Sequence, residues 1–361
     1  MPLRILYLSR VRLNPYVRLL AEGVQKADAG VTTAIAPTLA WRTLLSPGHP
    51  HLVHLHWLEL QYSYGHPPHR QAARALRQLL LELRFAQRRG IRLVYTVHNL
   101  HHHDELYPDL NTAANDWIFT HADAIHVHDE ATAAAVAGQH GRTAGVYIVP
   151  HGHYLHAYPN DIDRQSARQR LQLAPDAFVY LCLGQMRPYK GLDQLIHAFL
   201  SLPAAGNELV IAGQVGAGNQ GGQAFVQHLR LLAHDHPGVR LFPTYIADED
   251  LQIFFNAADA CVFPYRRATT SGAALLAYAC GKPIIAPAIG PFPDLISGDS
   301  GVLFQPGNGD LRQALDQARR IDPERARTAA LALVASRDWA SLGARHAALY
   351  RQITGKAAPS P

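Results

Sequence analysis

The feature that most constrains the fold of this chain is the alternation of short apolar segments with longer amphipathic ones. The apolar segments have the length of buried strands, and the segments between them are long enough to form helices. Strands that alternate with helices predict a parallel sheet covered on both faces. In the first part of the chain we expect strands over residues 3–9, 31–37, 51–57, 91–97, 123–128 and 145–150, and helices over 15–27, 70–89, 111–121 and 129–139.

A polar stretch divides this alternation into two series. Residues 151–177 contain Pro159 and Pro175, and we expect them to connect the two series through one short helix. Two such series predict an α/β protein with two Rossmann-like, doubly wound parallel-sheet domains that face a cleft. The strands expected in the second series cover residues 178–184, 208–213, 239–243, 259–264, 283–287 and 301–304.

The domain boundaries follow from this division. We expect an N-terminal domain over residues 1–155 and a C-terminal domain over residues 156–340. A helix over residues 341–354 is expected to cross back to the N-terminal domain. Residues 355–361 are expected to form a disordered tail.

Charge and cysteine content narrow the functional classes. The net charge of +5 suits acidic small molecules, anionic lipids and nucleic acids alike. The basic residues are scattered and form no recognition motif, which disfavours nucleic-acid binding. The three cysteines lie in apolar contexts without metal-ligand spacing, which indicates reduced thiols in a cytoplasmic protein. We expect no signal peptide and no membrane span, because no apolar run reaches roughly 18 residues.

Two cations follow the first strand of the second series, in the stretch CLGQMRPYKG. Gly184 lets the chain turn at the strand end, and Arg187 and Lys190 come directly after it. Open α/β sheets bind ligands at the carboxyl ends of their strands, where helix N-termini also favour anions. The alternative is a pair of solvated turn residues, but the position favours a site for a doubly charged group such as a diphosphate.

Several blocks of this chain resemble GT-B glycosyltransferases, particularly those of family 4. LGQMRPYKGLDQLIHAF is similar to the start of the donor-binding domain in that family, and VPHGHY is similar to its interdomain block. The resemblance covers nearly the whole chain and is most specific in the second half. It implies that residues 1–155 bind the acceptor and that residues 156–340 bind a nucleotide-sugar donor. The other blocks that carry it are ELVIAGQ, DACVFPYRRATTSGAALLAYACGKPIIAP and GVLFQPGNGDLRQAL.

The chain departs from the family at one motif. Family 4 usually carries Glu-x7-Glu, whose glutamates contact the donor sugar and the ribose, but the matching positions here hold Ala268 and Leu276. Thr270, Ser271 and Gly272 offer hydroxyl and backbone N–H groups at the start of a predicted helix instead. We therefore expect the nucleotide site to persist with altered sugar and ribose recognition. The resemblance does not imply retention or inversion.

The first series supplies further candidates at its strand ends. Arg12 and Asn14 follow the first strand, in a loop that in family members touches the donor phosphates or the acceptor. His98 is the leading catalytic candidate, because its ordinary pKa suits proton transfer near neutral pH. In an inverting mechanism His98, Glu59 or Asp104 would accept the acceptor proton. In a retaining mechanism His98 would hold the sugar. The alternative for His98 is a structural histidine.

The HHHDE cluster and the helix over residues 70–89 each have two interpretations. The HHHDE cluster at residues 101–105 could bind a metal, but consecutive histidines point in different directions, and an acceptor-facing or solvated loop is favoured. GT-B donors generally need no metal, so we expect no metal site and no tightly bound cofactor. The arginine-rich helix over residues 70–89 is read first as an ordinary surface helix, with peripheral contact to an anionic membrane as the alternative.

The leading hypothesis is a cytoplasmic hexosyltransferase of bacterial polysaccharide synthesis. It would move a sugar from a UDP- or GDP-sugar to a hydroxyl of a saccharide or lipid-linked acceptor, while Arg187 and Lys190 stabilise the departing diphosphate. One alternative is a catalytically degenerate binding partner. Another is a nucleotide-sugar epimerase, for which the segment 259–276 supplies only Asp259 as an acid. The sequence leaves the sugar, acceptor, linkage and oligomeric state open.

Overall fold

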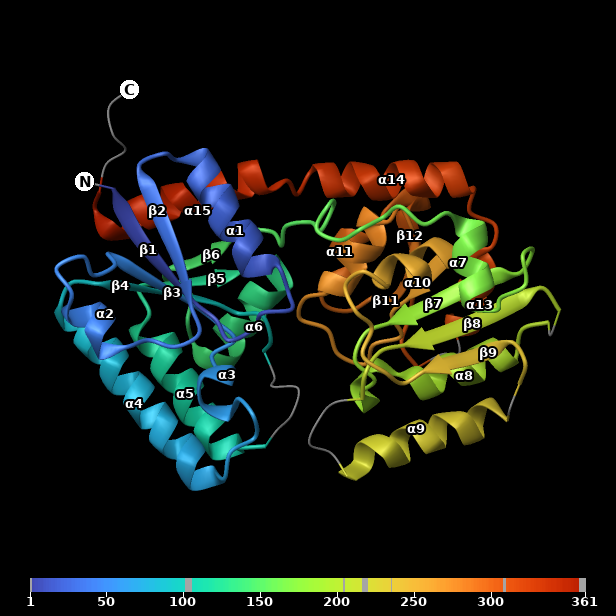
Figure 1. The fold of residues 1–361 in the computed structure, drawn as a ribbon, viewed down its shortest axis with the longest axis horizontal. Coiled ribbons are helices and arrows are strands. Elements are labelled where there is room, and N and C mark those ends of the chain that lie inside the picture. The colour runs from blue at the N-terminus through green and yellow to red at the C-terminus, as the bar shows by residue number, and fades with distance from the viewer. Residues whose placement is uncertain are drawn as a thin grey trace. The chain divides into compact units, whose positions relative to one another are not determined.

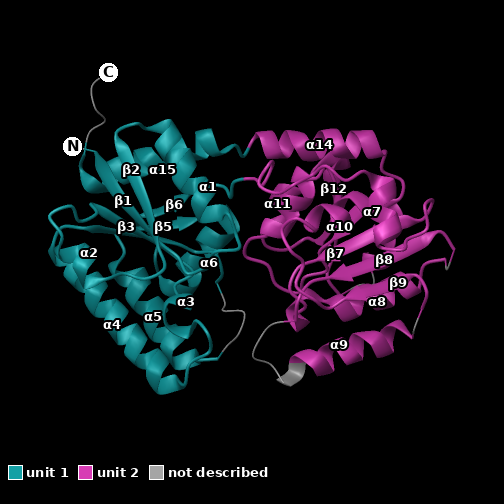
Figure 2. Ribbon diagram, in the orientation of Figure 1, with its two compact units in different colours: residues 1–152, 337–361 teal, residues 153–336 magenta. Residues whose placement is uncertain are grey.

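The computed structural model describes residues 2–100, 106–203, 205–215, 220–234, 236–307 and 310–356, without the side chains of residues 220 and 221. The chain forms two compact units (Figure 2). Unit 1 consists of Met1–Gly152 and Arg337–Pro361, and unit 2 consists of His153–Ser336. Each unit holds one six-stranded parallel sheet with helices on its faces (Figure 1), so the predicted α/β architecture of two Rossmann-like domains is confirmed.

The sheet of unit 1 has the strand order β2-β1-β3-β4-β5-β6. Adjacent strands pair in parallel, so their carboxyl ends lie along one edge. Ligand-binding side chains of doubly wound sheets gather at that edge. The strands are β1 (Leu3–Leu8), β2 (Val31–Ala36), β3 (Leu52–His56), β4 (Arg92–Thr96), β5 (Ala124–Val127) and β6 (Val146–Ile148).

Two hydrophobic cores cover the faces of this sheet. On one face the strands pack against α4 (His69–Arg88), α5 (Pro108–His121) and α6 (Glu130–His140). On the other face they pack against α1 (Tyr16–Ala27) and the C-terminal helix α15 (Trp339–Thr354). The short helices α2 (Trp41–Leu45) and α3 (Leu60–Ser63) follow β2 and β3.

Two glycines bring α1 and α15 into close contact. A Cβ on Gly343 would lie 2.2 Å from the carbonyl carbon of Gly23, and a Cβ on Gly23 would lie 2.4 Å from the carbonyl oxygen of Trp339. Asp28 at the end of α1 also accepts hydrogen bonds from two nitrogens of Arg351 at 2.5 and 2.8 Å. The last helix is therefore an integral part of unit 1.

The sheet of unit 2 has the order β12-β11-β10-β7-β8-β9 and is again parallel. Its strands are β7 (Phe178–Leu183), β8 (Asn207–Ala212), β9 (Val239–Phe242), β10 (Ala260–Val262), β11 (Ile284–Pro287) and β12 (Gly301–Phe304). One face packs against α8 (Leu192–Leu200), α9 (Gln220–Ala233) and α13 (Asp310–Ala318). The remaining helices are α7 (Arg164–Arg170), α10 (Leu251–Ala257), α11 (Gly272–Ala279), α12 (Phe292–Leu295) and α14 (Pro323–Ala335), with 3-10 turns at Pro188–Lys190 and Gly298–Ser300.

Each expected strand overlaps an observed one, because most of the strands are apolar runs bounded by turn residues. The polar stretch 151–177 contains the single short helix α7, and α5 begins earlier than expected, at Pro108. Proline at a first helical position fits this start, because its fixed φ matches the helix. The short helices α2 and α3 were not predicted, since they are too short to show helical periodicity.

Candidate functional site

The predicted diphosphate site lies at the carboxyl end of β7 in unit 2. The strand ends at Leu183, Gly184 follows with a positive φ of 134°, and the chain then forms a 3-10 turn over Pro188–Lys190. A Cβ on Gly184 would lie 2.6 Å from Nζ of Lys190. Glycine at this position therefore leaves room for the ammonium group directly beneath the strand end.

Lys190 is a buried cation. Its side chain is 9% exposed, and its Nζ lies 5.1 Å from the centre of the Tyr265 ring. No carboxylate among the described residues forms an ion pair with it. Desolvation, with a smaller contribution from the positive charge of the neighbouring Arg187, lowers the pKa of Lys190 to about 8. The guanidinium of Arg187 is half-buried and donates through Nε to Gln185 at 3.0 Å.

The loop after β10 closes against this turn. Gly191 has φ +66°, and a Cβ there would lie 2.1 Å from the carbonyl oxygen of Pro264, so no other residue fits without movement. Arg266 donates to the carbonyl of Pro188 at 2.7 Å and to Asp193 at 2.6 Å. These contacts hold the loop 264–267 beside Lys190.

The predicted Thr270–Ser271–Gly272 segment begins α11. Ser271 is buried, and its Oγ accepts from the N–H of Ala274, so it caps the helix. Tyr265 lies beside both Lys190 and Ser271. The lysine site and the start of α11 therefore share one neighbour, and the N–H groups of the first two residues of α11, Gly272 and Ala273, remain for an anion. Thr269 and Thr270 are half-buried in the same loop.

The two positions that replace the family glutamates are packed apolar sites. The carbonyl oxygen of Ala268 would lie 2.3 Å from a Cβ on Gly290, so a second loop fits closely here. Leu276 is 8% exposed and lines a cavity of about 390 Å³ between α10, α11 and residues 154–160. Gln252 also lines this cavity, but its Oε1 already accepts from the N–H groups of Asp161 and Ile162. Leu276 therefore presents an apolar side chain to this cavity.

In unit 1, His98 follows β4 and is 4% exposed. The Trp57 ring stacks on it at 3.9 Å with an interplanar angle of 7°, and Tyr16 meets it edge-on at 5.0 Å. Its Nε2 lies 2.9 Å from Nδ1 of His56. Burial, and then the neighbouring histidines, hold the pKa of His98 well below its usual range, so the ring is neutral.

The other predicted residues of unit 1 have different settings. Glu59 directly precedes α3 and is half-buried, and desolvation raises its pKa to about 7. Asn14 accepts from the N–H of Tyr16 at 2.9 Å and thus helps start α1, whereas Arg12 is exposed. Asp104 and the rest of the HHHDE cluster lie outside the described residues.

Sequence reasoning missed a group of histidines around His98. His56, His98, His128 and His151 lie at or just after the carboxyl ends of four adjacent strands, β3 to β6, and each packs against the ring of Tyr16. Burial lowers the pKa of His56 to about 3 and of His151 to about 4. The His-x-His pairs at 54–56 and 126–128 were the available signal, because alternate residues of a strand share a face.

A chain of hydrogen bonds continues this layer toward α15. The carbonyl of Val149 accepts from Nε2 of His126 at 2.9 Å and from Nδ1 of His128 at 3.2 Å, which fixes both tautomers. Nδ1 of His126 must then accept from the Thr96 hydroxyl at 2.9 Å. Because the Thr96 hydroxyl donates its one proton to His126, it must accept from Nε2 of His54. Nδ1 of His54 then accepts from the Tyr350 hydroxyl, which in turn accepts from the Tyr7 hydroxyl, and both histidines are neutral.

Two negative findings concern the part of the chain that the structure describes. There, no group of three or more His, Cys, Asp or Glu side chains is arranged to hold a metal ion. No helix in the described ranges is both long and apolar enough to cross a membrane.

Comparison with known proteins identifies relatives of this chain. Residues 177–320 match the family model described as "Glycosyl transferases group 1". A D-inositol 3-phosphate glycosyltransferase from Actinosynnema mirum is 29% identical over 71% of this chain and 61% of its own length. The enzyme of that name from Mycobacterium bovis is 28% identical over 83% of this chain and 61% of its own length. The chain thus spans about three fifths of the length of the curated relatives it matches.

Solved structures share the fold at low sequence identity. Sucrose-phosphate synthase from Thermosynechococcus elongatus aligns with a TM-score of 0.73 at 19% identity, over 99% of this chain and 100% of that structure. Anabaena Alr3699/HepE, solved in complex with UDP-glucose, aligns with a TM-score of 0.70 at 18% identity, over 96% and 98%. Both likenesses span both units of this chain.

Proposed function

We propose that this chain, a GT-B glycosyltransferase of the family 4 type, transfers a sugar from a UDP- or GDP-sugar to a hydroxyl of a saccharide or lipid-linked saccharide. In that reaction the bond between the anomeric carbon and the diphosphate oxygen breaks, and a bond to the acceptor oxygen forms. The diphosphate leaves with added negative charge, and the acceptor hydroxyl loses its proton.

The observation that carries the proposal is the buried ammonium of Lys190, which pairs with no carboxylate in the described ranges. An ammonium that no carboxylate neutralises is costly to bury, and a diphosphate anion would offset that cost. Arg187, on the same turn, adds a guanidinium that can bind a second phosphate oxygen. Both cations and the start of α11 would stabilise the charge that develops on the leaving diphosphate.

Unit 1 contains candidate residues for accepting the hydroxyl proton and for binding the sugar. Glu59, with a pKa of about 7, is suited to accept the hydroxyl proton near neutral pH if the reaction inverts. Neutral His98 is suited to hold a sugar hydroxyl through a hydrogen bond, because its lowered pKa makes it a weak base. The shifts therefore favour Glu59 over His98 as the base, and Asp104 stays a candidate. Arg12 and Asn14 remain candidates for contact with the donor phosphates or the acceptor.

The finer parts of the proposal concern the setting of the reaction. A function in polysaccharide synthesis at the cytoplasmic face of a membrane fits a lipid-linked acceptor. The relatives named for D-inositol 3-phosphate support an acceptor that carries a hydroxyl on a ring. We propose peripheral contact with anionic lipid and no requirement for a metal ion or a tightly bound cofactor.

A donor screen tests the proposal. Thermal denaturation of the full chain should shift upward with UDP or GDP, or with one of their sugars, and the Arg187→Ala/Lys190→Ala variant should lose that shift. An Arg170→Ala/Arg230→Ala variant, altered at two exposed arginines of unit 2, should keep it. No shift with any nucleotide would overturn the donor site. A shift without turnover of any donor would instead favour the degenerate binding partner.

A further inference from the structure

We propose that the outward face of α4 docks on an anionic lipid membrane. The surface consists of five arginines, called the arginine stripe, and of apolar side chains at its edge. The inference rests on the membrane contact of the proposed function and names the surface that makes it. The arginine stripe comprises Arg70, Arg74, Arg77, Arg84 and Arg88.

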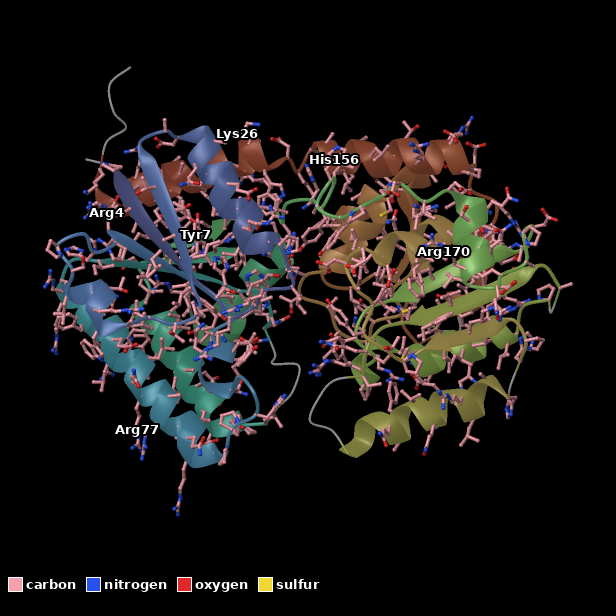
Figure 3. The ribbon with its side chains drawn as sticks, in the orientation of Figure 1. Arg4, Tyr7, Lys26, Arg77, His156 and Arg170 are labelled. Atoms are coloured by element: carbon pink, nitrogen blue, oxygen red, sulfur yellow. The ribbon has the colours of Figure 1, made fainter. Side chains whose placement is uncertain are left out.

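The arginine stripe is a straight line along one helix. Its members recur at intervals of three or four residues, with Leu81 at the position between Arg77 and Arg84, so they share one side of α4. From Arg70 to Arg88 the line extends for about 27 Å. The opposite side of the helix packs into the core through Leu76, Leu79 and Leu83. All five arginines are exposed, and Arg77 points away from the sheet (Figure 3).

The charges of the arginine stripe are not offset by any side chain in the described part of the protein. None of the five guanidinium groups makes a hydrogen bond or ion pair with a described residue. The single acid of α4, Glu82, is buried and accepts from Gln78 at 3.0 Å. Asp109 pairs with His69, and Asp123 pairs with Arg92. A line of like charges without internal partners favours an external polyanion.

Apolar side chains distinguish a membrane from other polyanions. Leu81, within the line of arginines, is 56% exposed. Trp41 and Leu45 of α2 are 41% and 57% exposed, and the Trp41 ring packs edge-on against Phe85 of α4 at 5.2 Å. The exposed apolar groups therefore border the arginines. A lipid surface offers phosphates together with an apolar layer, which suits arginine, leucine and tryptophan at once.

Vesicle binding by the full chain tests this surface. We expect sedimentation with vesicles of phosphatidylcholine and phosphatidylglycerol at a 7:3 ratio, weakened by salt, and little sedimentation with phosphatidylcholine alone. Arg74→Gln/Arg77→Gln/Arg84→Gln should lower the partition coefficient by about 100-fold, since each arginine contributes about fivefold. The matched control Arg170→Gln/Arg230→Gln/Arg325→Gln changes three exposed arginines of unit 2 by the same charge and should bind as the wild type does.

Trp41 provides a second readout at the surface itself. Tryptophan emission should shift to shorter wavelength on addition of the anionic vesicles, and Trp41→Phe should remove that shift while sedimentation persists. Equal sedimentation of the stripe variant and the wild type would overturn the assignment to α4. Tighter binding of the stripe to duplex DNA or heparin than to the vesicles would overturn the lipid assignment.

The outcomes separate this inference from the proposed function. If the wild type does not sediment with anionic vesicles, both the membrane contact and its assignment to α4 are wrong, but the proposed donor binding is not affected. The stripe variant should keep the thermal shift with UDP or GDP, because its substitutions lie far in sequence from Arg187 and Lys190 and in the other unit.

Discussion

Nδ1 of His56 lies 2.9 Å from Nε2 of His98, and both rings are buried beside Tyr16. One nitrogen must donate and the other accept, so the protonation of each ring depends on the other. His98→Ala should lower kcat by about 100-fold, and His56→Ala by about 10-fold with an altered pH profile. The double variant should resemble His98→Ala. Equal and additive losses, with an unchanged pH profile for His56→Ala, would show that the two rings act independently.

The burial of Lys190 predicts that its ammonium destabilises unit 2 while it supports nucleotide binding. Lys190→Met removes a cation whose folded pKa is about 8 against an ordinary 10.5, so unit 2 should gain about 3 kcal/mol at pH 7 while nucleotide binding is lost. A lowered lysine pKa penalises the fold below pH 8, and that penalty fades as the pH rises toward 10.5. The gain should therefore shrink at pH 10 in calorimetry. Destabilisation by Lys190→Met at both pH values would contradict this account.

The buried histidines predict acid sensitivity of unit 1. Burial lowers the pKa of His151 and His346 to about 4, and of His54 and His126 well below 6.5. The fold keeps these rings neutral, so stability is present above pH 6.5 and falls as the pH drops toward 4. Each ring lowers the free energy of unfolding by about 1.4 kcal/mol for each pH unit of that fall.

Tryptophan fluorescence isolates this effect, because all four tryptophans of the chain belong to unit 1. Urea midpoints should fall steeply between pH 6.5 and 5. His346→Gln should flatten the slope by about one proton, whereas the exposed His66→Gln should not. An unchanged midpoint across that range would refute the prediction.

Gly191 predicts a steric requirement next to the 3-10 turn over Pro188–Lys190. Gly191→Ala adds a Cβ at φ +66° and 2.1 Å from the Pro264 carbonyl oxygen. Gly206 has a similar backbone conformation, with φ +76°, but a Cβ there would have no atom within 4 Å. Gly206→Ala therefore measures the cost of the left-handed backbone alone, about 1–2 kcal/mol of folding free energy. Gly191→Ala should destabilise unit 2 by more than this control and abolish the nucleotide-induced thermal shift. Matching losses for both variants would contradict the collision.

The fold could be predicted from the sequence because most strands are apolar runs separated by segments long enough to form helices. The position of Arg187 and Lys190 after a strand end could be predicted from the sequence, whereas their binding of a diphosphate stays a prediction. The burial of Lys190 could not be predicted, since it depends on Tyr265, which lies in another loop after another strand. The clustering of His56, His128 and His151 could not be predicted either, because it depends on the order of the strands in the sheet rather than on sequence spacing. The catalytic roles of His98, Glu59 and Asp104 stay predictions.

The central claim is that Arg187 and Lys190 hold the diphosphate of a nucleotide donor. Titration calorimetry with UDP, GDP, UMP and GMP tests it most directly, because the members of each pair differ only in the second phosphate. We predict that one diphosphate binds at least tenfold more tightly than its monophosphate, and that Arg187→Ala/Lys190→Ala removes this difference. Equal affinity for diphosphate and monophosphate, or a preference that survives in the double variant, would contradict the claim.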